Sequence, residues 1–255
     1  MKPGPRAAYA APALEKGLDI LECLADQRVP LTQAQLAREL RRSPSEVFRM
    51  LACLEQRGYI RKDPVSNAYA LSLKLFELSR THSPYQHLTK AALRPMQMLA
   101  EEMHESCHLS VLHRSRLVIL AQEESPEKIR LSIQVGASFD PLRTVSGRLL
   151  LAMMEHEERQ QALALMQKYH GGQAAAKRTL ERQLRTIRSR GYSDVYSESV
   201  RGVYDLAVLV AGDAVRAALT VACLSKDVAG TRNRLLPALR RTSTEISRVA
   251  GLLTI

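Results

Sequence analysis

The chain has 255 residues, which exceeds the usual ~100–150 of one domain and predicts two domains. Lys and Arg number 37 against 26 Asp and Glu, and the net charge of +11 favours a polyanionic partner. No apolar run approaches the ~20 residues that cross a bilayer, and residues 1–13 lack the apolar core of a signal peptide. These features exclude a membrane protein, and we expect a cytoplasmic one.

The first 40 residues predict two helices. Leucines recur at three- and four-residue steps over residues 13–26, at Leu14, Leu18, Leu21 and Leu24. This spacing gives a helix with one apolar stripe. After a turn at 28–30, Thr32 is a suitable N-terminal cap for a second helix that carries Leu36 and Leu40.

The segment Ser43-Pro44-Ser45-Glu46 predicts the start of a third helix, over 44–56. The Ser43 side chain can accept a hydrogen bond from the Glu46 amide, and Glu46 can reach back to Ser43, while Pro44 suits the first helical position. Val47, Leu51 and Leu54 would then face the first two helices. This is the layout of a helix-turn-helix whose second helix enters a DNA groove.

The exposed side of that helix is expected to read DNA. Arg49 is the best candidate for a bidentate contact to guanine, Ser45 lies beside it, and Glu46 either accepts from cytosine or only completes the cap. The residues expected at the phosphates are Thr32, Gln33, Arg42, Ser43, Arg61 and Lys62, with Arg41 next to them before the cap. A winged helix that serves protein contacts is the alternative for the same motif.

Residues 59–71 predict a small hairpin, or wing, in which segments 59–61 and 69–71 flank a turn at 63–67. Lys62 and Asn67 are its expected DNA contacts. Helices over 73–82 and 86–103 follow, separated by Ser83-Pro84. Their apolar faces fit either dimer contacts or packing on the chain's own domain.

From residue 106 the apolar period becomes alternating, which predicts strands. Strands are expected at 107–113, 116–122, 129–136, 192–197, 203–210 and 215–223, and helices at 147–154, 157–169, 177–190 and 230–253. Helices that flank a mostly antiparallel sheet give an α+β domain. We expect a winged helix-turn-helix domain over 10–72, a linker helix over 73–88 and the α+β domain over 89–255.

The segment His104-Glu105-Ser106-Cys107-His108 matches the H-E-x-x-H pattern of zinc hydrolases. That site needs one helix through both histidines, whereas the apolar period here changes after Met103. We therefore interpret it as a helix-to-strand junction, with a metal hydrolase using His104, Glu105 and His108 as a remote alternative. The four cysteines are far apart, and no catalytic triad or glycine-rich phosphate loop occurs. We expect no enzyme, metal or cofactor.

Several separated segments of the chain follow one another in the order and spacing of a known protein family. They are Ala13–Leu21, Ser43–Leu54, Arg57–Ile60, Tyr69–Leu75, Pro141-Leu142, Ser146–Ala152, Arg190–Tyr192, Gly202-Val203 and Ala217–Val221. In these segments the chain resembles the IclR-type bacterial transcriptional regulators. The resemblance implies a winged helix-turn-helix head, a GAF-like domain that senses a small molecule, and a homodimer or homotetramer on double-stranded, palindromic operator DNA.

The expected effector site lies where a helix begins near Ser146-Gly147, because free amides at such a start suit a carboxylate or phosphate. Arg143 could supply a cation, and Asp205 and Thr220 could face the same cavity from neighbouring strands. The expected effector residues are therefore Arg143, Val145, Ser146, Gly147, Asp205 and Thr220. The ligand class this favours is an organic acid. Arg143 and Asp205 could equally be exposed or paired with other residues for structural reasons.

The resemblance also shows departures from the family pattern. Relatives that bind small oxo-acids carry an acidic group, a thiol and two serines at positions matched here by Val195, Asp205, Thr220 and Ala222. A changed ligand fits this difference. So does a constitutive DNA-binding regulator whose second domain only oligomerises.

Overall fold

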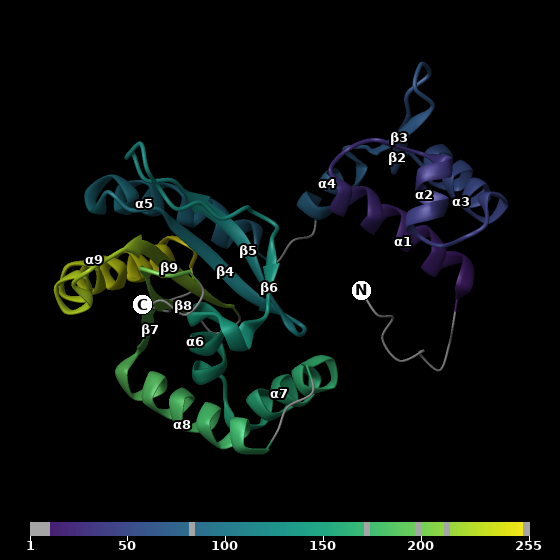
Figure 1. Ribbon diagram of the computed structural model, residues 1–255. Coiled ribbons are helices and arrows are strands. Elements are labelled where there is room, and N and C mark those ends of the chain that lie inside the picture. The colour runs from purple at the N-terminus through teal and green to yellow at the C-terminus, as the bar shows by residue number, and fades with distance from the viewer. Residues whose placement is uncertain (1–10, 82–84, 171–173, 197–199, 212–214, 252–255) are drawn as a thin grey trace. The chain divides into compact units, whose positions relative to one another are not determined.

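The computed structural model describes residues 11–81, 85–170, 174–196, 200–211 and 215–251 (Figure 1). The chain divides into two units, Met1–Ser83 and Pro84–Ile255. The α+β fold expected from the sequence is confirmed, with helices and antiparallel strands in both units. None of the helices in the described ranges has the length and apolar character needed to span a bilayer.

In the first unit, the helices before residue 57 and a three-stranded sheet form a winged helix-turn-helix, as expected. Its elements are α1 (Pro12–Gln27), β1 (Leu31–Thr32), α2 (Gln33–Glu39), α3 (Pro44–Gln56), β2 (Ile60–Lys62) and β3 (Ala68–Leu71). The strand order is β1-β3-β2, and all pairs are antiparallel. The sequence did not predict β1, because a two-residue strand is too short to show a period. Its Leu31 pairs with Tyr69 and joins the core.

The helix starts follow the capping residues that the sequence indicated. The Ser43 Oγ accepts from the Glu46 amide at 3.4 Å, and the Ser43 amide donates to Glu46 Oε2 at 3.2 Å. Thr32 and Gln35 form the same reciprocal arrangement at the start of α2. Val47 and Leu51 of α3 are then fully buried with Leu36 of α2. The caps therefore set the rotation of α3, and with it the face that stays exposed.

Two further helices, α4 (Lys74–Thr81) and α5 (Gln86–Met103), occupy the expected segments. The division of the chain places α4 in the first unit and α5 in the second. The Ser83-Pro84 break predicted between them lies outside the described residues. The linker boundaries at 73 and 88 stay a prediction.

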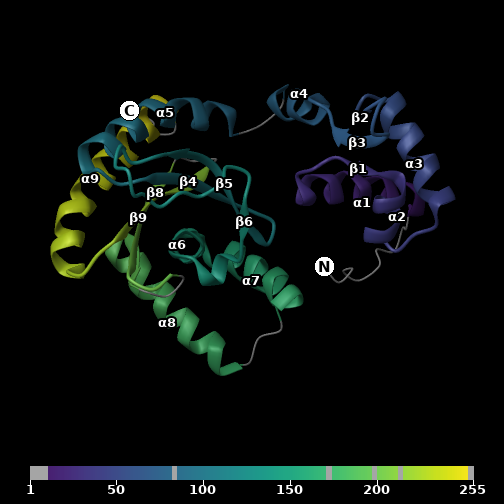
Figure 2. The same ribbon diagram turned by 45° about the horizontal axis from the view of Figure 1, so that its top comes forward.

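The second unit is built on one antiparallel sheet with the strand order β6-β5-β4-β9-β8-β7. Its strands are β4 (Cys107–His113), β5 (Arg116–Glu123), β6 (Ser138–Phe139), β7 (Tyr192–Tyr196), β8 (Val203–Ala211) and β9 (Arg216–Leu224). The helices α5 and α9 (Val228–Val249) lie side by side on one face (Figures 1 and 2). On the other face lies α6 (Val145–Met153), which packs against α8 (Ala174–Arg190) and α7 (His156–His170).

Side chains of β8 alternate between the two faces, as its sequence pattern requires. Leu206, Val208 and Val210 join the core under α5 and α9, whereas Ala207 and Leu209 join the core under α6. Apart from the strand expected at 129–136, the expected strands and helices of the second unit agree with these elements to within a few residues. The predicted ends at Ser197 and Leu253 lie outside the described residues.

The strand expected at 129–136 does not form, and this prediction is wrong. The edge strand β6 instead lies at Ser138–Phe139, where Leu117 pairs with Phe139. The preceding segment is tied to β5 by a side chain: Gln122 Oε1 accepts from the Ile133 amide at 2.5 Å, and Gln122 Nε2 donates to Ser132 Oγ at 2.7 Å. The alternating pattern was misleading because Ile129 is solvent-exposed, whereas Ile133 lines a cavity.

Candidate nucleic-acid interface and ligand pocket

The free face of α3 carries Ser45, the adjacent Phe48 and Arg49, and Ala52, all of them exposed. Ser45 and Ala52 each lie three or four residues from that central pair. The structure thus leaves Ser45 and Arg49 on the solvent side, as the sequence predicted. Phe48 was missed. It is 55% exposed although it is aromatic. Its position directly after the inward Val47 was the signal that placed it on the outer face.

Glu46 is engaged in contacts within the protein. Lys16 Nζ of α1 lies 2.5 Å from Glu46 Oε1, and the other carboxylate oxygen takes part in the cap at Ser43. The Lys16 hydrogen bond, followed by those from Ser43, lowers the Glu46 pKa to about 2. Of the two roles left open by the sequence, these contacts favour the cap over a contact to cytosine.

Arg42 and Gln33 also bond within the first unit. Arg42 Nη2 lies 2.5 Å from Asp19 Oδ2 of α1, and Arg42 Nε is buried. Gln33 Nε2 donates to the Pro44 carbonyl at 3.0 Å. These bonds therefore fix the start of α3 relative to the other two helices, Arg42 relative to α1 and Gln33 relative to α2. Arg41, Ser43 and Thr32 lie beside them, and only the first two are exposed.

The wing presents Arg61, Lys62 and Asn67, all exposed. Its turn is organised by Asp63, whose Oδ1 accepts from the Ser66 amide at 2.7 Å, and hydrogen bonds led by this one lower the Asp63 pKa. Asn67 adopts a left-handed conformation, with φ +56°, which asparagine tolerates better than most residues. Lys62 Nζ lies 5.7 Å from the centre of the Tyr69 ring.

The histidines of the H-E-x-x-H pattern do not share a helical face. His104 is the C-cap of α5, with φ +57°, and its exposed Nδ1 lies 3.1 Å from Glu127 Oε1. His108 lies on β4. The predicted helix-to-strand junction is confirmed, and the zinc-hydrolase geometry is absent from this described segment.

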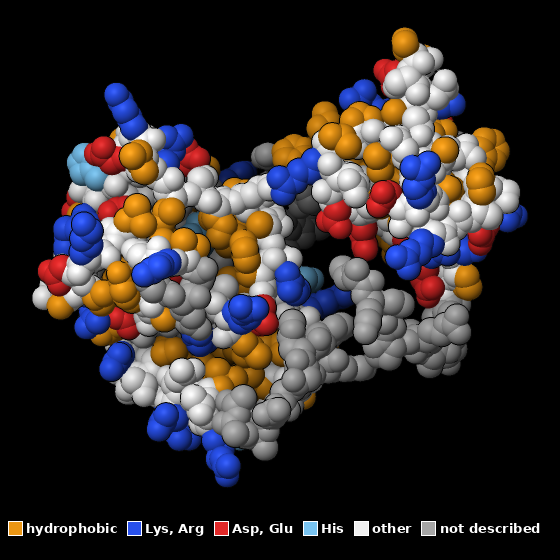
Figure 3. Space-filling model, in the orientation of Figure 1, with side chains coloured by type: hydrophobic (Ala, Val, Ile, Leu, Met, Phe, Trp, Pro, Cys, Tyr) orange, Lys and Arg blue, Asp and Glu red, His pale blue; other side chains and the backbone are white. Residues whose placement is uncertain are grey.

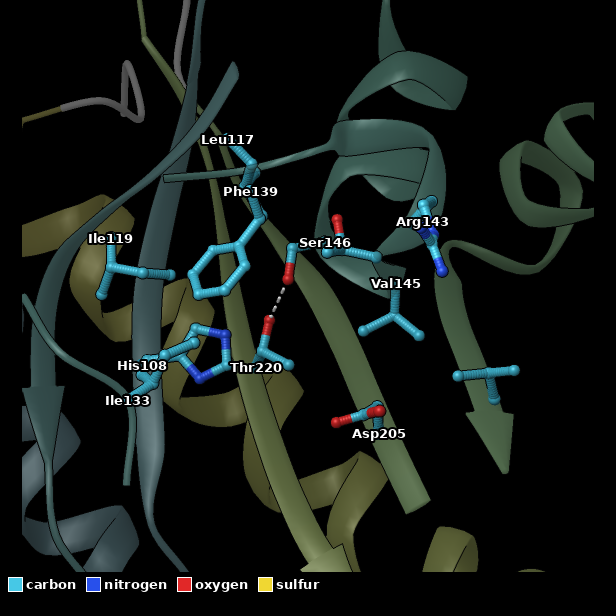
Figure 4. Close-up of a pocket in the computed structure, with 12 residues that line it drawn as sticks. His108, Leu117, Ile119, Ile133, Phe139, Arg143, Val145, Ser146, Asp205 and Thr220 are labelled. Carbon is cyan, nitrogen blue, oxygen red and sulfur yellow. Dashed lines mark hydrogen bonds between the residues drawn. The ribbon is translucent and has the colours of Figure 1, made fainter. Parts of the chain in front are cut away.

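In the second unit, a cavity of about 140 Å³ lies between α6 and the sheet (Figure 4). The predicted effector residues Arg143, Val145, Ser146, Asp205 and Thr220 all line it. Apolar side chains supply most of the remaining wall, namely Leu117, Ile119, Ile133, Phe139 and Val195. The structure thus brings together residues that are far apart in the sequence. Arg143 is exposed and lies at the edge of the cavity.

Ser146 and Thr220 form a polar pair inside this cavity. Their hydroxyl oxygens lie 2.9 Å apart, and both residues are buried (Figure 4). This hydrogen bond joins the first turn of α6 to β9, across the sheet face that α6 covers. Each hydroxyl keeps a lone pair with which it can accept a further hydrogen bond from a ligand.

His108 also lines the cavity, and the sequence gave it no such role. It stands directly opposite Thr220 in the pairing of β4 with β9. Burial lowers the His108 pKa to about 4, so the ring is neutral at pH 7. With Ile133, Phe139 and Asp205, His108 also lines a second cavity of about 480 Å³.

Gly147 is not part of the cavity wall. Its amide donates to Thr144 Oγ1 at 3.1 Å, so it is not one of the free amides expected at this helix start. A side chain on Gly147 would overlap main-chain atoms of Pro141. We conclude that Gly147 is needed for the close approach of α6 to the Pro141–Arg143 turn.

Comparison with known families accounts for both units. The IclR helix-turn-helix domain matches residues 13–64, and the C-terminal domain of the bacterial transcriptional regulator IclR matches residues 83–248. The chain belongs to the IclR family of bacterial transcriptional regulators. It is therefore a regulator with a helix-turn-helix DNA-binding domain and a C-terminal effector domain.

Several IclR-family regulators are similar along much of their length. The HTH-type regulator KdgR of Dickeya chrysanthemi is 28% identical over 205 residues, which cover 76% of this chain and 64% of that KdgR, just under two thirds. KdgR of Escherichia coli K12 is 27% identical, with 76% and 74% covered. An IclR homologue of Microbacterium hydrocarbonoxydans, crystallised with 4-hydroxybenzoate, shares the fold at a TM-score of 0.79 with 19% identity, over 94% and 99% of the two chains.

Proposed function

We propose that the effector of this regulator is a small carboxylic acid, bound in the cavity beneath α6, and that its binding changes affinity for operator DNA. The observation that supports this most is that one cavity contains both an exposed guanidinium, Arg143, and the buried hydroxyls of Ser146 and Thr220. The rest of its wall is mostly apolar. Few oriented polar groups in an apolar cavity are typical of small-molecule sites.

The lining suggests how such a ligand lies. Arg143 can hold a carboxylate through two parallel hydrogen bonds. In Figure 4 Asp205 lies on the other side of Val145 from Arg143, so the ligand carboxylate is expected toward Arg143 and away from Asp205. Neutral His108, with Ser146 and Thr220, suits an uncharged hydroxyl or carbonyl group on the ligand.

The proposed effect on DNA is thermodynamic linkage. An effector that binds one arrangement of the oligomer better than another shifts operator affinity, and the operator shifts effector affinity by the same factor. The cavity supports this proposal over a constitutive regulator, which has no need of a ligand site.

We propose that Ser45, Phe48 and Arg49 contact bases, with Phe48 packing against a thymine methyl group. The phosphates are then held by Thr32, Gln33, Arg41, Ser43, Arg61, Lys62 and Asn67. In this proposal Glu46 and Arg42 position α3, because both are already paired with α1.

The effector proposal can be tested by titrating the full chain with small organic acids while following a labelled operator fragment. We begin with 4-hydroxybenzoate, which a solved relative binds. An acid that changes operator affinity is expected to bind about tenfold more weakly to Arg143→Gln, a loss of ~1.4 kcal/mol. Lys128→Gln, which removes an exposed charge outside the cavity, is the control. If no acid changes operator affinity or thermal stability, the constitutive alternative is correct.

We also propose that the protein is a homodimer or a homotetramer assembled from dimers. Helix α4 exposes Leu75, Phe76 and Leu78, with Phe76 55% exposed, and two linked heads can read the two halves of a palindromic operator. Light scattering on a sizing column is expected to show at least a dimer, and Phe76→Ser is expected to lower the mass at equal concentration. A monomeric wild-type protein at micromolar concentration contradicts the proposal.

A further inference from the structure

We propose that a cleft between α8 and β7 binds the phosphate group of a small phosphorylated metabolite, at a site separate from the effector cavity. The cleft measures about 280 Å³ and is lined by Arg148 of α6 and by Arg182 and Arg190 of α8. The side of the second unit that carries α8 shows several Lys and Arg side chains (Figure 3). This inference does not depend on the identity of the effector.

The charge of the cleft is positive. Asp194 is the acidic residue among the described residues that line it, and it is already paired elsewhere. Arg232 Nε lies 2.8 Å from Asp194 Oδ2, and Tyr204 Oη donates to the same oxygen at 3.0 Å. Arg190 Nη1 is 3.9 Å from Asp194 Oδ1, which is a weak contact. Because Arg232 already balances Asp194, the guanidiniums of Arg182 and Arg190 leave an excess of positive charge at this end of the cleft.

Two of these arginines are restrained by contacts, Arg148 through its side chain and Arg190 through its main chain. Arg148 is only 8% exposed, and its Nη1 donates to the Leu142 carbonyl at 3.3 Å, which restricts the guanidinium. The Arg190 carbonyl accepts from Arg240 Nη2 at 3.1 Å, which ties the end of α8 to α9. A guanidinium that is already restrained loses less entropy when it binds an anion.

A purely structural role, in which arginines offset the dipole of α8, explains only part of this group of lining arginines. Basic side chains near a helix C-terminus offset the helix dipole, which accounts for Arg190. It does not account for Arg182, which lies two turns before the end of α8. The Arg182 carbonyl accepts from Thr186 Oγ1, but its guanidinium has neither a hydrogen-bond acceptor nor an acidic partner among the described residues. The guanidinium of Arg182 is therefore available to a ligand in the cleft.

The lining also indicates the ligand class. Several guanidiniums suit a phosphate dianion, which offers three terminal oxygens, better than a carboxylate, which offers two. Gln183, Thr186 and Ser193 add neutral donors and acceptors that match hydroxyl groups on a carbon skeleton. Val195 lines both this cleft and the effector cavity, so the two sites are neighbours.

The test is isothermal titration of the full chain, at fixed ionic strength, with inorganic phosphate, glucose 6-phosphate and glucose. We expect both phosphates to bind and glucose not to bind. Arg182→Gln and Arg190→Gln are each expected to weaken binding about tenfold. Arg178→Gln removes the same charge one turn before Arg182, outside the cleft, and is expected to leave binding unchanged.

Three outcomes overturn the proposal. The first is that neither phosphate binds at millimolar concentration. The second is that Arg178→Gln weakens binding as much as Arg182→Gln, which indicates general attraction of anions to α8. In the third, Arg182→Gln weakens operator binding while the wild-type chain binds no phosphate probe, which assigns the arginine to DNA contact. Circular dichroism of each variant checks that the fold is retained.

Discussion

Replacing Arg49 by alanine is expected to lower the affinity for operator DNA by roughly 1–3 kcal/mol and to relax the sequence preference at one operator position. Arg49 is exposed on the same face of α3 as Ser45 and Phe48. A bidentate contact from its guanidinium to the O6 and N7 atoms of guanine explains both effects, because alanine keeps the helix and removes the donors. The measurement is a binding titration on the operator and on variants changed at single base pairs.

Arg57→Ala is the matched control for this prediction. Arg57 is the C-cap of the same helix and is exposed, so the variant removes the same charge from the other end of α3. Arg57→Ala is expected to weaken binding by the same factor on all DNA sequences, because it removes only general electrostatic attraction. That factor is expected to be smaller than the loss caused by Arg49→Ala on the operator. An unchanged operator footprint and affinity in Arg49→Ala would refute the base-reading role.

Replacing Gly147 by alanine is expected to destabilise the second unit by about 3 kcal/mol, since the new methyl group has no space. It would lie within 2.7 Å of the Pro141 carbonyl carbon, and main-chain atoms cannot move aside as the end of a side chain can. At ~2–4 °C per kcal/mol, the thermal midpoint should fall by roughly 10 °C. Thermal and urea unfolding followed by circular dichroism measure this change.

Gly17→Ala is the control for the same substitution in open space. Gly17 lies inside α1, and a side chain there meets no atom within 4 Å. Alanine is a better helix former than glycine, so the free energy of unfolding of this variant is expected to rise by about 0.5–1 kcal/mol. If Gly147→Ala is as stable as the wild-type chain, α6 does not require its close approach to Pro141. The cavity beneath α6 is then less rigid than the contacts around α6 indicate.

The DNA-binding unit was largely predictable because its signals are local. The cap at Ser43, the following Pro44 and the inward spacing of Val47 and Leu51 lie within nine residues of one another, and they fix where α3 begins and which face is buried. What those signals could not show is that Glu46 and Arg42 are paired with Lys16 and Asp19 of α1. Such pairs depend on the packing of helices that are distant in the chain.

The strand expected at 129–136 failed for a related reason. Alternation of apolar and polar residues is compatible with several extended conformations. Only a neighbouring strand decides whether the segment forms a ladder of main-chain hydrogen bonds. Here the side chain of Gln122 bonds the Ile133 amide, so a main-chain partner is replaced by a side chain. Ile133 then lines the cavity instead of joining a sheet face.

The sequence by itself determined the order of the helices, most of the strands, the exposed position of Arg49 and the set of polar residues near α6. Only the tertiary structure decided that His108 stands opposite Thr220 and that Thr220 bonds Ser146, 74 residues away. It also decided that Gly147 packs against Pro141 and does not line the cavity. The physical reason is that caps and periodicities act within a few turns of chain. Strand pairing and close packing join residues whose separation in sequence carries no signal of their contact.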